Sequence, residues 1–328
     1  MTVKALDHKL SRILSGHYTA DDFVMADAKD ADMAFGVQAP GADPARPGTF
    51  RSRDQYLAHM AAEVAVDGAI DILLTSASNG ERLVKDGVLD GTPVTLAVRA
   101  NDTTDIWNPR GGTYATQPSR PFRTANLELV REFCDLVLYS VTFNNDLERD
   151  LATLEGYAAF REQARAVGIR HFLEVFNPNA PAGLDPQDVG AFVNDHIIRL
   201  LAGVTAAERP QFLKMAFNGA GHLSELVGHD PSLVVGILGG SAGTTRDTFE
   251  LLSQGEAHGA RVALFGRKIQ RSESQLDLLA GMRAVLNGKV TPEQGVIDYH
   301  DALRAKGLTP TRSLADDLVI TEPVLSQA

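Results

Sequence analysis

The sequence predicts an α/β protein folded as a single (β/α)8 barrel with an extra helix at its N-terminus. Two observations support this fold class. Eight short apolar segments, rich in β-branched residues, follow one another along the 328 residues and end in small or polar residues, as buried strands do. Helical patterns lie between these segments, and strands that alternate with helices form parallel β-α units. Eight such units close naturally into a barrel.

The predicted strands have clear boundaries in the sequence. They cover residues 23–27, 70–76, 93–99, 134–142, 169–176, 211–217, 232–238 and 260–265. Residues 1–20 are expected to form a helix that covers the N-terminal end of the barrel. Residues 21–328 are expected to form the barrel itself, as one catalytic domain.

The connecting segments contain two well-marked helices and two long loops. Apolar residues at helical spacing predict a helix over 146–166, with Leu147 and Leu151 on its apolar face, and another over 186–203. The second helix follows Asp185-Pro186, an N-cap with proline at the first helical position. The turn-rich loops 36–56 and 100–122 follow strands one and three, so both fall on the C-terminal face, where barrels carry their active sites.

The alternative is an open, doubly wound sheet. The glycines between Gly236 and Gly243 loosely resemble a dinucleotide-binding loop. They follow the seventh strand rather than the first, their spacing is not G-x-G-x-x-G, and no acidic residue ends a strand about 20 residues later. The barrel is therefore favoured.

Composition excludes several classes of protein. With 44% hydrophobic and 22% charged residues, the chain matches a globular protein. A net charge of -11 gives no basic footprint for nucleic acid or an anionic membrane. The lone Cys134 excludes an internal disulfide, and the nine histidines lack metal-site spacing, so no metal and no cofactor are expected. The N-terminus lacks the apolar stretch of a signal peptide, which predicts a soluble, cytoplasmic protein without a membrane span.

Two charged residues in apolar strands are the main catalytic candidates. Lys214 lies in Phe-Leu-Lys-Met-Ala-Phe, and burial there favours a neutral, nucleophilic amine. Glu174 occupies the matching place in the preceding strand, and alternation along each strand turns both side chains toward the barrel mouth. They form either an ion pair or an acid/base couple, and both descriptions can hold at different stages of one reaction.

Three further strand residues are candidates. Asp27 ends the first predicted strand, where a barrel enzyme places catalytic groups; the alternative is a helix N-cap. Tyr139 in strand four and Arg99 in strand three have a position and parity that predict an inward orientation. Either of these two can instead serve only in packing or ion pairing.

The last two strands end in loops suited to an anion. Gly239, Gly240 and Ser241 follow strand seven, and Gly266-Arg267 follows strand eight. Glycines let backbone N–H groups approach an anion, arginine offers a planar fork for phosphate oxygens, and barrels often bind phosphate between these two loops. The alternative is that the glycines serve only to form tight turns.

A series of segments in this order carries a family resemblance. The segments are Met25-Ala-Asp27, Ile72-Leu-Leu, Leu138-Tyr139, Phe172-Leu-Glu174, Leu213-Lys214, Ile237-Leu-Gly-Gly and Gly266-Arg267. Together they span most of the chain, which resembles the class I aldolases of the tagatose-1,6-bisphosphate aldolase type. These belong to a superfamily that includes archaeal-type fructose-bisphosphate and deoxyribose-phosphate aldolases. Asp135, where a lysine is expected in the closest relatives, and the glycine-rich seventh loop depart from the pattern.

The resemblance implies a metal-independent aldolase that uses a lysine Schiff base. Lys214 is then the imine-forming lysine, Glu174 or Tyr139 the proton carrier, and Asp27 the acid that steadies them. The phosphate of a sugar phosphate is held by the residues of loops seven and eight, with Arg99 as a further substrate-binding residue. The products are a dihydroxyacetone-phosphate-like ketone and an aldehyde, and the family is usually homo-oligomeric. A deoxysugar-phosphate aldolase, a thiolase-like acyl transferase and a non-catalytic sugar-phosphate-binding protein remain alternatives.

Overall fold

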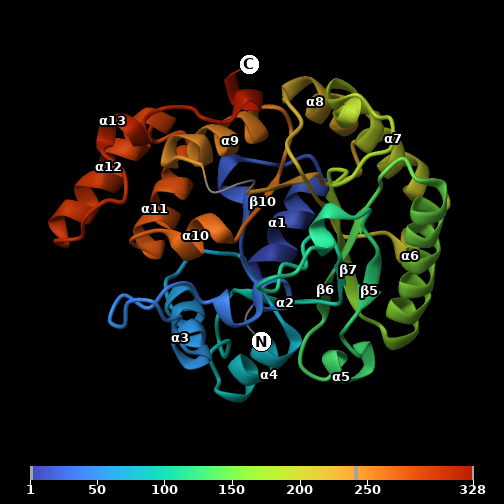
Figure 1. The fold of residues 1–328 in the computed structure, drawn as a ribbon, viewed down its shortest axis with the longest axis horizontal. Coiled ribbons are helices and arrows are strands. Elements are labelled where there is room, and N and C mark those ends of the chain that lie inside the picture. Colours follow the sequence, from blue (N-terminus) through green and yellow to red (C-terminus); the bar gives the residue numbers. More distant parts are fainter. Residues whose placement is uncertain (1–2, 240–242, 327–328) are drawn as a thin grey trace.

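A closed barrel of eight parallel strands forms the centre of the molecule, and helices surround it (Figure 1). The computed structural model describes residues 3–239 and 243–326. The barrel strands are β1 Val24–Lys29, β2 Ile72–Thr75, β3 Thr95–Arg99, β6 Leu136–Thr142, β7 Arg170–Phe176, β8 Leu213–Met215, β9 Gly236–Leu238 and β10 Val262–Phe265. Their order around the barrel is β1-β10-β9-β8-β7-β6-β3-β2. Each of the eight predicted strands overlaps one of these, so the barrel is confirmed and the open sheet is excluded.

The helices follow the strands as β-α units require, with several additions. They are α1 Ala5–Leu14, α2 Asp32–Phe35, α3 Arg53–Val64, α4 Ala77–Lys85, α5 Leu127–Arg131, α6 Leu147–Val167, α7 Val189–Leu201, α8 Ala220–His229, α9 Thr245–Ala257, α10 Arg267–Arg271, α11 Gln275–Leu286, α12 Pro292–Ala305 and α13 Leu314–Asp317. The long third loop also contains a small antiparallel sheet of β4 Asn101–Thr103 and β5 Pro121–Arg123, which the sequence did not predict.

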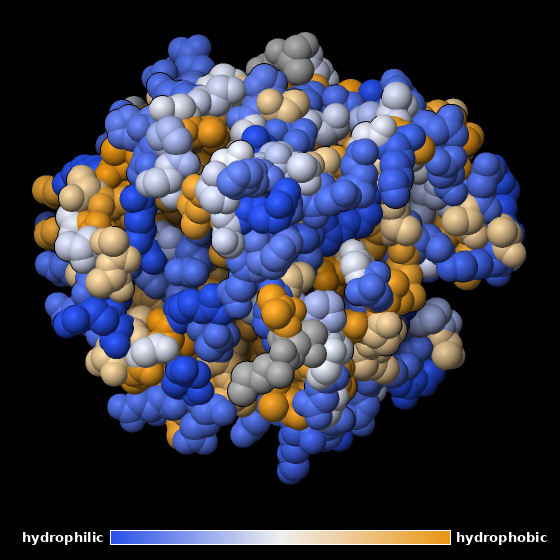
Figure 2. All heavy atoms as spheres, turned by 180° about the vertical axis from the view of Figure 1, so that it is seen from behind, coloured by the Kyte–Doolittle hydropathy of each residue, from blue (hydrophilic) through white to orange (hydrophobic). Residues whose placement is uncertain are grey.

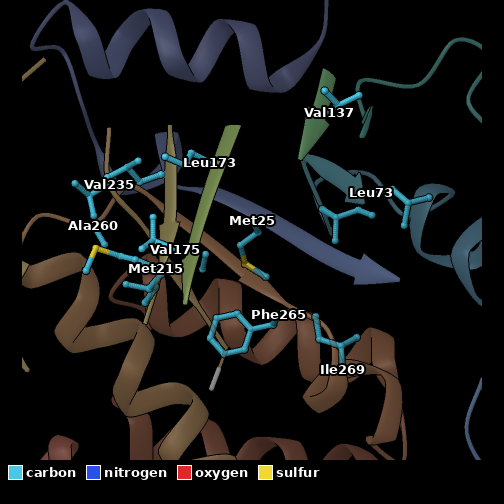
Figure 3. Close-up of a cluster of buried hydrophobic side chains, with 14 of the residues drawn as sticks. Met25, Leu73, Val137, Leu173, Val175, Met215, Val235, Ala260, Phe265 and Ile269 are labelled. Carbon is cyan, nitrogen blue, oxygen red and sulfur yellow. The ribbon is translucent and has the colours of Figure 1, made fainter. Parts of the chain in front are cut away.

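The strands divide the apolar core into two layers. Side chains such as Val24, Leu138 and Phe172 fill the barrel interior. Their neighbours along the strands point outward and pack against the helices, as Met25 and Leu173 do (Figure 3). Both faces of every barrel strand are buried, and successive side chains point to opposite faces. Whether a residue holds an odd or an even position in its strand, here called its parity, therefore decides which layer it joins.

Helix α1 closes the N-terminal end of the barrel, as predicted for residues 1–20. Leu6 and Leu10 join the interior layer of apolar side chains. Lys4 Nζ donates hydrogen bonds to the backbone oxygens of Thr92 and Val94, at 3.0 and 2.9 Å, just before β3. Water is therefore excluded from this end, and the opposite end remains for a functional site.

Helix α6 buries a different face from the one that its leucines predict. Leu147 and Leu151 are 80% and 47% exposed, whereas Tyr157, Phe160 and Ala164 are buried against the barrel. The aromatic side chains bury more area than the two leucines, so they decide which face of α6 packs inward.

The surface seen from behind is mostly hydrophilic with scattered hydrophobic residues (Figure 2). Among residues 3–239 and 243–326, no helix has the length and apolar character needed to cross a membrane.

Candidate active site

The register of three neighbouring strands places Ser140, Glu174 and Lys214 in one row inside the barrel. Ser140 pairs with Glu174 between β6 and β7, and Glu174 pairs with Lys214 between β7 and β8. Below this row the rings of Phe172 and Phe212 stack, with centroids 4.5 Å apart. The polar groups therefore lie on an apolar floor, at the end of the barrel opposite α1. The predicted inward orientation of Glu174 and Lys214 is confirmed.

Glu174 is held by three donors. Its Oε1 lies 2.5 Å from Lys214 Nζ. Its Oε2 accepts hydrogen bonds from Arg99 Nη2 at 2.9 Å and from Ser140 Oγ at 2.7 Å. The side chains of Glu174 and Lys214 are 2% and 7% exposed, so this ion pair is buried.

The pKa of Glu174 follows from its two cationic neighbours. Burial by itself raises the pKa of a carboxyl group, but the positive charges of Lys214 and Arg99 outweigh burial, and the pKa of Glu174 is lowered from its ordinary value. Glu174 is therefore a carboxylate at neutral pH. Its Oε1 lies 2.5 Å from Lys214 Nζ, so the two groups are placed for proton transfer.

Arg99 faces the barrel interior, as predicted, and holds carboxylates there. Its Nε donates to Asp30 and its Nη1 donates to Ser140 Oγ at 2.6 Å, while Nη2 reaches Glu174. Asp102 Oδ1 lies 3.8 Å from Nη1. These neighbours raise the pKa of Arg99, against the opposing effect of burial. Arg99 thus orients Glu174, and much of its charge is offset inside the protein.

Sequence reasoning missed three polar residues of this site, Asp30, Asp102 and Ser140. Ser140 has the parity of Leu138, so the alternation of strand four could have indicated it. Asp30 points to the same side of the strand as Ala26 and Ala28, but it lies three positions beyond the end expected for strand one. Asp102 lies in β4, whose pairing with β5 has no local signal in the sequence.

A cavity of about 270 Å³ opens above this row at the C-terminal ends of the strands. Glu174 and Lys214 line it together with residues at or after the ends of β1, β3, β9 and β10. The polar residues and glycines among them are Asp30, Arg99, Asp102, Asp105, Asn108, Gly239, Gly266, Arg267 and Lys268. Among the described residues, no group of three or more His, Cys, Asp or Glu side chains is arranged to hold a metal ion.

The predicted anion loops meet at this cavity. Gly239, Gly266 and Arg267 line it, and Lys268 adds a second cation that the sequence analysis did not select. A Cβ added at Gly266 would lie 2.6 Å from the backbone oxygen of Ala28, so only glycine fits this close approach of loop eight to β1. Gly240 and Ser241, also predicted here, lie outside the described residues.

Asp27 does not lie in the cavity, so its predicted position is wrong. It shares the outward parity of Met25, and its carboxylate pairs with Lys29 Nζ at 2.6 Å, behind the barrel wall. Lys29 Nζ also lies 3.0 Å from Glu63 of α3. The strand continues to Lys29, two residues past its predicted end, and this extension leaves Asp30, not Asp27, at the mouth of the barrel.

Tyr139 also faces outward, and its predicted inward orientation is wrong. In the β6–β7 register it lies opposite Leu173, which belongs to the outer apolar layer. Its ring packs against Tyr157 and Phe160 of α6, with centroid distances of 5.4 and 4.3 Å. Burial raises the pKa of Tyr139 to about 12. It therefore serves in the packing between barrel and helix.

The cavity thus combines an amine, a proton acceptor at 2.5 Å and two cations from the last loop. An amine that can lose its proton to an adjacent carboxylate is able to attack a carbonyl carbon. Cations on another wall can bind an anionic part of the same molecule.

Comparison with known proteins finds similarity in structure alone. No family model matches the sequence, and no curated protein matches it. The crystal structure of an archaeal fructose 1,6-bisphosphate aldolase is 16% identical, with a TM-score of 0.61 over 86% of this chain and 99% of that chain.

Two further solved structures are similar. An archaeal fructose-1,6-bisphosphate aldolase whose catalytic lysine is covalently bound to the carbinolamine intermediate is 16% identical, with a TM-score of 0.60 over 86% of this chain and 100% of that chain. The fructose-bisphosphate aldolase from Slackia heliotrinireducens DSM 20476 is 14% identical, with a TM-score of 0.62 over 91% of this chain and 90% of that chain. Over most of its length, this chain therefore shares the (β/α)8 barrel fold of these aldolases.

Proposed function

We propose that this protein is a class I aldolase that cleaves or forms a ketose phosphate through a Schiff base on Lys214. The observation that carries the proposal is the buried pair of Lys214 and Glu174, 2.5 Å apart, that faces the cavity. Binding alone does not need a buried amine beside a proton acceptor. The fold shared with a Schiff-base-forming fructose-1,6-bisphosphate aldolase supports the same chemistry. The narrower proposal, the tagatose-bisphosphate type, rests on the order of the sequence segments alone.

The reaction uses the pair twice. Lys214 passes a proton to Glu174, and the neutral amine attacks the ketone carbon. Glu174 returns this proton to the oxygen and then carries a second proton from the attached nitrogen to it, so the oxygen leaves as water and an iminium remains. The iminium accepts the electron pair of the C3–C4 bond as the C4 hydroxyl gives its proton to Glu174, so an aldehyde leaves. Protonation of the enamine carbon and hydrolysis of the imine then release a dihydroxyacetone-phosphate-like ketone.

The other residues bind and orient the substrate. Arg267 and Lys268, with Gly239 and Gly266, hold the phosphate, so that remote binding fixes the distance between the carbonyl carbon and Lys214. Arg99 is a positioning residue that acts through Glu174. Since the iminium serves as the electron acceptor, the reaction needs no metal, and treatment with EDTA should leave the turnover rate unchanged.

The test is borohydride trapping of the imine, followed by intact-mass measurement and peptide mapping. With dihydroxyacetone phosphate or a ketose phosphate, we expect a substrate-sized mass increase on Lys214. Lys214→Ala should lose both the adduct and the turnover while it remains folded by circular dichroism. Lys85→Ala, at the exposed end of α4, is the matched control and should keep both. Normal turnover in folded Lys214→Ala, or an adduct on another lysine, would overturn the proposal.

A further inference from the structure

The cavity has a cationic wall formed by the last strand and the loop that follows it. Arg267 and Lys268 come directly after β10, and both line the cavity. Lys268 Nζ donates a hydrogen bond to the backbone oxygen of Gly243 at 2.9 Å, which holds it beside loop seven.

The segment after β3 forms an opposing wall of acidic side chains. In the closed order of the eight strands, β3 lies three steps from β10 in one direction and five in the other, so the segment after β3 lies across the barrel mouth from the two cations. Asp102 and Asp105 line the cavity from this segment. Asp105 accepts hydrogen bonds from Ser119 Oγ at 2.8 Å and from Thr142 Oγ1 at 2.9 Å, and both groups are neutral donors.

Asp102, which lines the cavity, has one carboxyl oxygen without a partner among the described residues. Its Oδ1 accepts a hydrogen bond from the backbone N–H of Thr103 at 2.9 Å. Its Oδ2 is buried and accepts no hydrogen bond from the described residues, and the residue as a whole is 1% exposed. A buried acceptor without a donor is costly, and a hydroxyl group of a bound molecule would satisfy it.

The cations near this wall offset its charge only in part. Arg99 is shared between Asp30, Glu174 and, at 3.8 Å, Asp102, and Lys214 is paired with Glu174. Among the described residues that line this part of the cavity, the carboxylates are Asp30, Asp102, Asp105 and Glu174, and the cations are Arg99 and Lys214. The acidic groups therefore outnumber the cations in this part of the cavity. Burial raises the pKa of Asp102 to about 7, so Asp102 carries its full charge only above neutral pH, whereas the partners of Asp105 are neutral donors.

This division of charge has a direct consequence for a phosphorylated sugar. A phosphate group is attracted to the cationic wall and repelled by the acidic one, and repulsion in a partly enclosed site is only weakly screened. Hydroxyl groups, by contrast, can donate hydrogen bonds to carboxylates. We propose that the substrate is a ketose monophosphate, with its phosphate at Arg267 and Lys268 and its hydroxyl-bearing end at Asp102 and Asp105, and that the acidic wall rejects a bisphosphate. This inference rests on the proposed aldolase function.

The first experiment compares matched substrates. Values of kcat/KM are measured at pH 8, where Asp102 is ionised, for fructose and tagatose 1-phosphates and for the corresponding 1,6-bisphosphates. In the synthetic direction, dihydroxyacetone phosphate is paired with glyceraldehyde or glyceraldehyde 3-phosphate. We expect kcat/KM to be at least about tenfold higher for the substrate without the second phosphate, a factor that corresponds to about 1.4 kcal/mol. Equal or higher values for the bisphosphates would overturn the inference.

Charge-removing variants test whether the acidic wall is the cause. Asp102→Asn should reduce the preference for the monophosphate several-fold, and Asp105→Asn is the second variant should the first fold poorly. Asp67→Asn removes the same charge from an exposed loop before β2 and should leave the preference unchanged. Arg267→Ala should raise KM for both substrates alike. An unchanged preference in both wall variants would overturn the inference.

The two proposals fail in different ways. If borohydride traps no lysine adduct with dihydroxyacetone phosphate or with any of the four ketose phosphates, the aldolase function is wrong, and the substrate inference falls with it. If Lys214 forms adducts and the bisphosphates are the better substrates, only the substrate inference is wrong.

Discussion

Glu174 connects the two cations at the barrel mouth, and its role can be separated from that of Lys214. Glu174→Gln keeps the shape of the side chain but cannot accept the lysine proton. We expect kcat to fall by about 10²- to 10⁴-fold, the usual contribution of a general acid/base, with a smaller change in KM. Steady-state kinetics and the rate of borohydride trapping measure this effect. A kcat within threefold of the parent, in a variant with parental circular dichroism, would exclude Glu174 as the proton carrier.

Asp102 makes stability depend on pH. Burial raises the pKa of Asp102 to about 7, with partial opposition from Arg99. The unfolded chain loses this proton near pH 4, while the folded protein keeps it to about pH 7, so the free energy of unfolding decreases as pH rises through this interval.

Replacement of Asp102 removes this dependence. The free energy of unfolding of Asp102→Asn, relative to that of the parent, should therefore increase as pH rises from 4 to 8. The gain is about 4 kcal/mol at most, at about 1.4 kcal/mol for each pH unit between the two pKa values. Urea denaturation at pH 4.5 and pH 8 measures it, with Asp67→Asn as the control. A constant difference between variant and parent at both pH values would contradict the raised pKa.

At the scale of elements, β1 separates a catalytic face from a structural one. Its outward side chains Asp27 and Lys29 form a buried cluster with Glu63 of α3. Burial, together with the charge of Asp27, raises the pKa of Glu63 to about 9, so Glu63 is largely protonated at neutral pH. Two acidic residues and one lysine can thus be buried together with little net charge.

This arrangement predicts a structural effect for Asp27→Asn. Glu63 must then ionise to pair with Lys29, so we expect the free energy of unfolding to fall by about 1–3 kcal/mol. The kcat of the folded protein should remain within about threefold, because the cluster lies behind the barrel wall. Glu63→Gln, which resembles the protonated form, should change stability less. A kcat loss of 100-fold or more in folded Asp27→Asn would restore a catalytic role to this residue.

At the scale of the whole molecule, the two ends of the barrel have separate tasks. Helix α1 closes one end with Leu6 and Leu10, and the site occupies the other. Leu6 is fully buried, so Leu6→Ala should lower the free energy of unfolding by about 2–5 kcal/mol, through lost burial and the cavity left behind.

The matched control lies on the same helix. Leu14 is 56% exposed, so Leu14→Ala should change stability by no more than about 0.5 kcal/mol. Urea denaturation compares the two variants, and KM for the ketose phosphate should be unchanged in both. A large KM increase in folded Leu6→Ala would show that the closed end influences the site.

The sequence by itself determined the barrel and the central pair of the site. Eight apolar runs between helical patterns specify parallel β-α units, because each element must bury an apolar face against the next. The period-two alternation of neighbouring strands then turns Glu174 and Lys214 to the same side, where the register pairs them. These signals are local and need no knowledge of distant contacts.

Only the tertiary structure decided the orientation and partners of the remaining residues. In a barrel both faces of each strand are buried, so composition does not tell inward from outward residues, and Asp27 and Tyr139 proved to face the helices. The partners of Arg99 come from three other strands and the loop after β1, and Asp102 reaches the cavity through the pairing of β4 with β5. Such contacts join residues far apart in the chain, and they form only when the barrel closes.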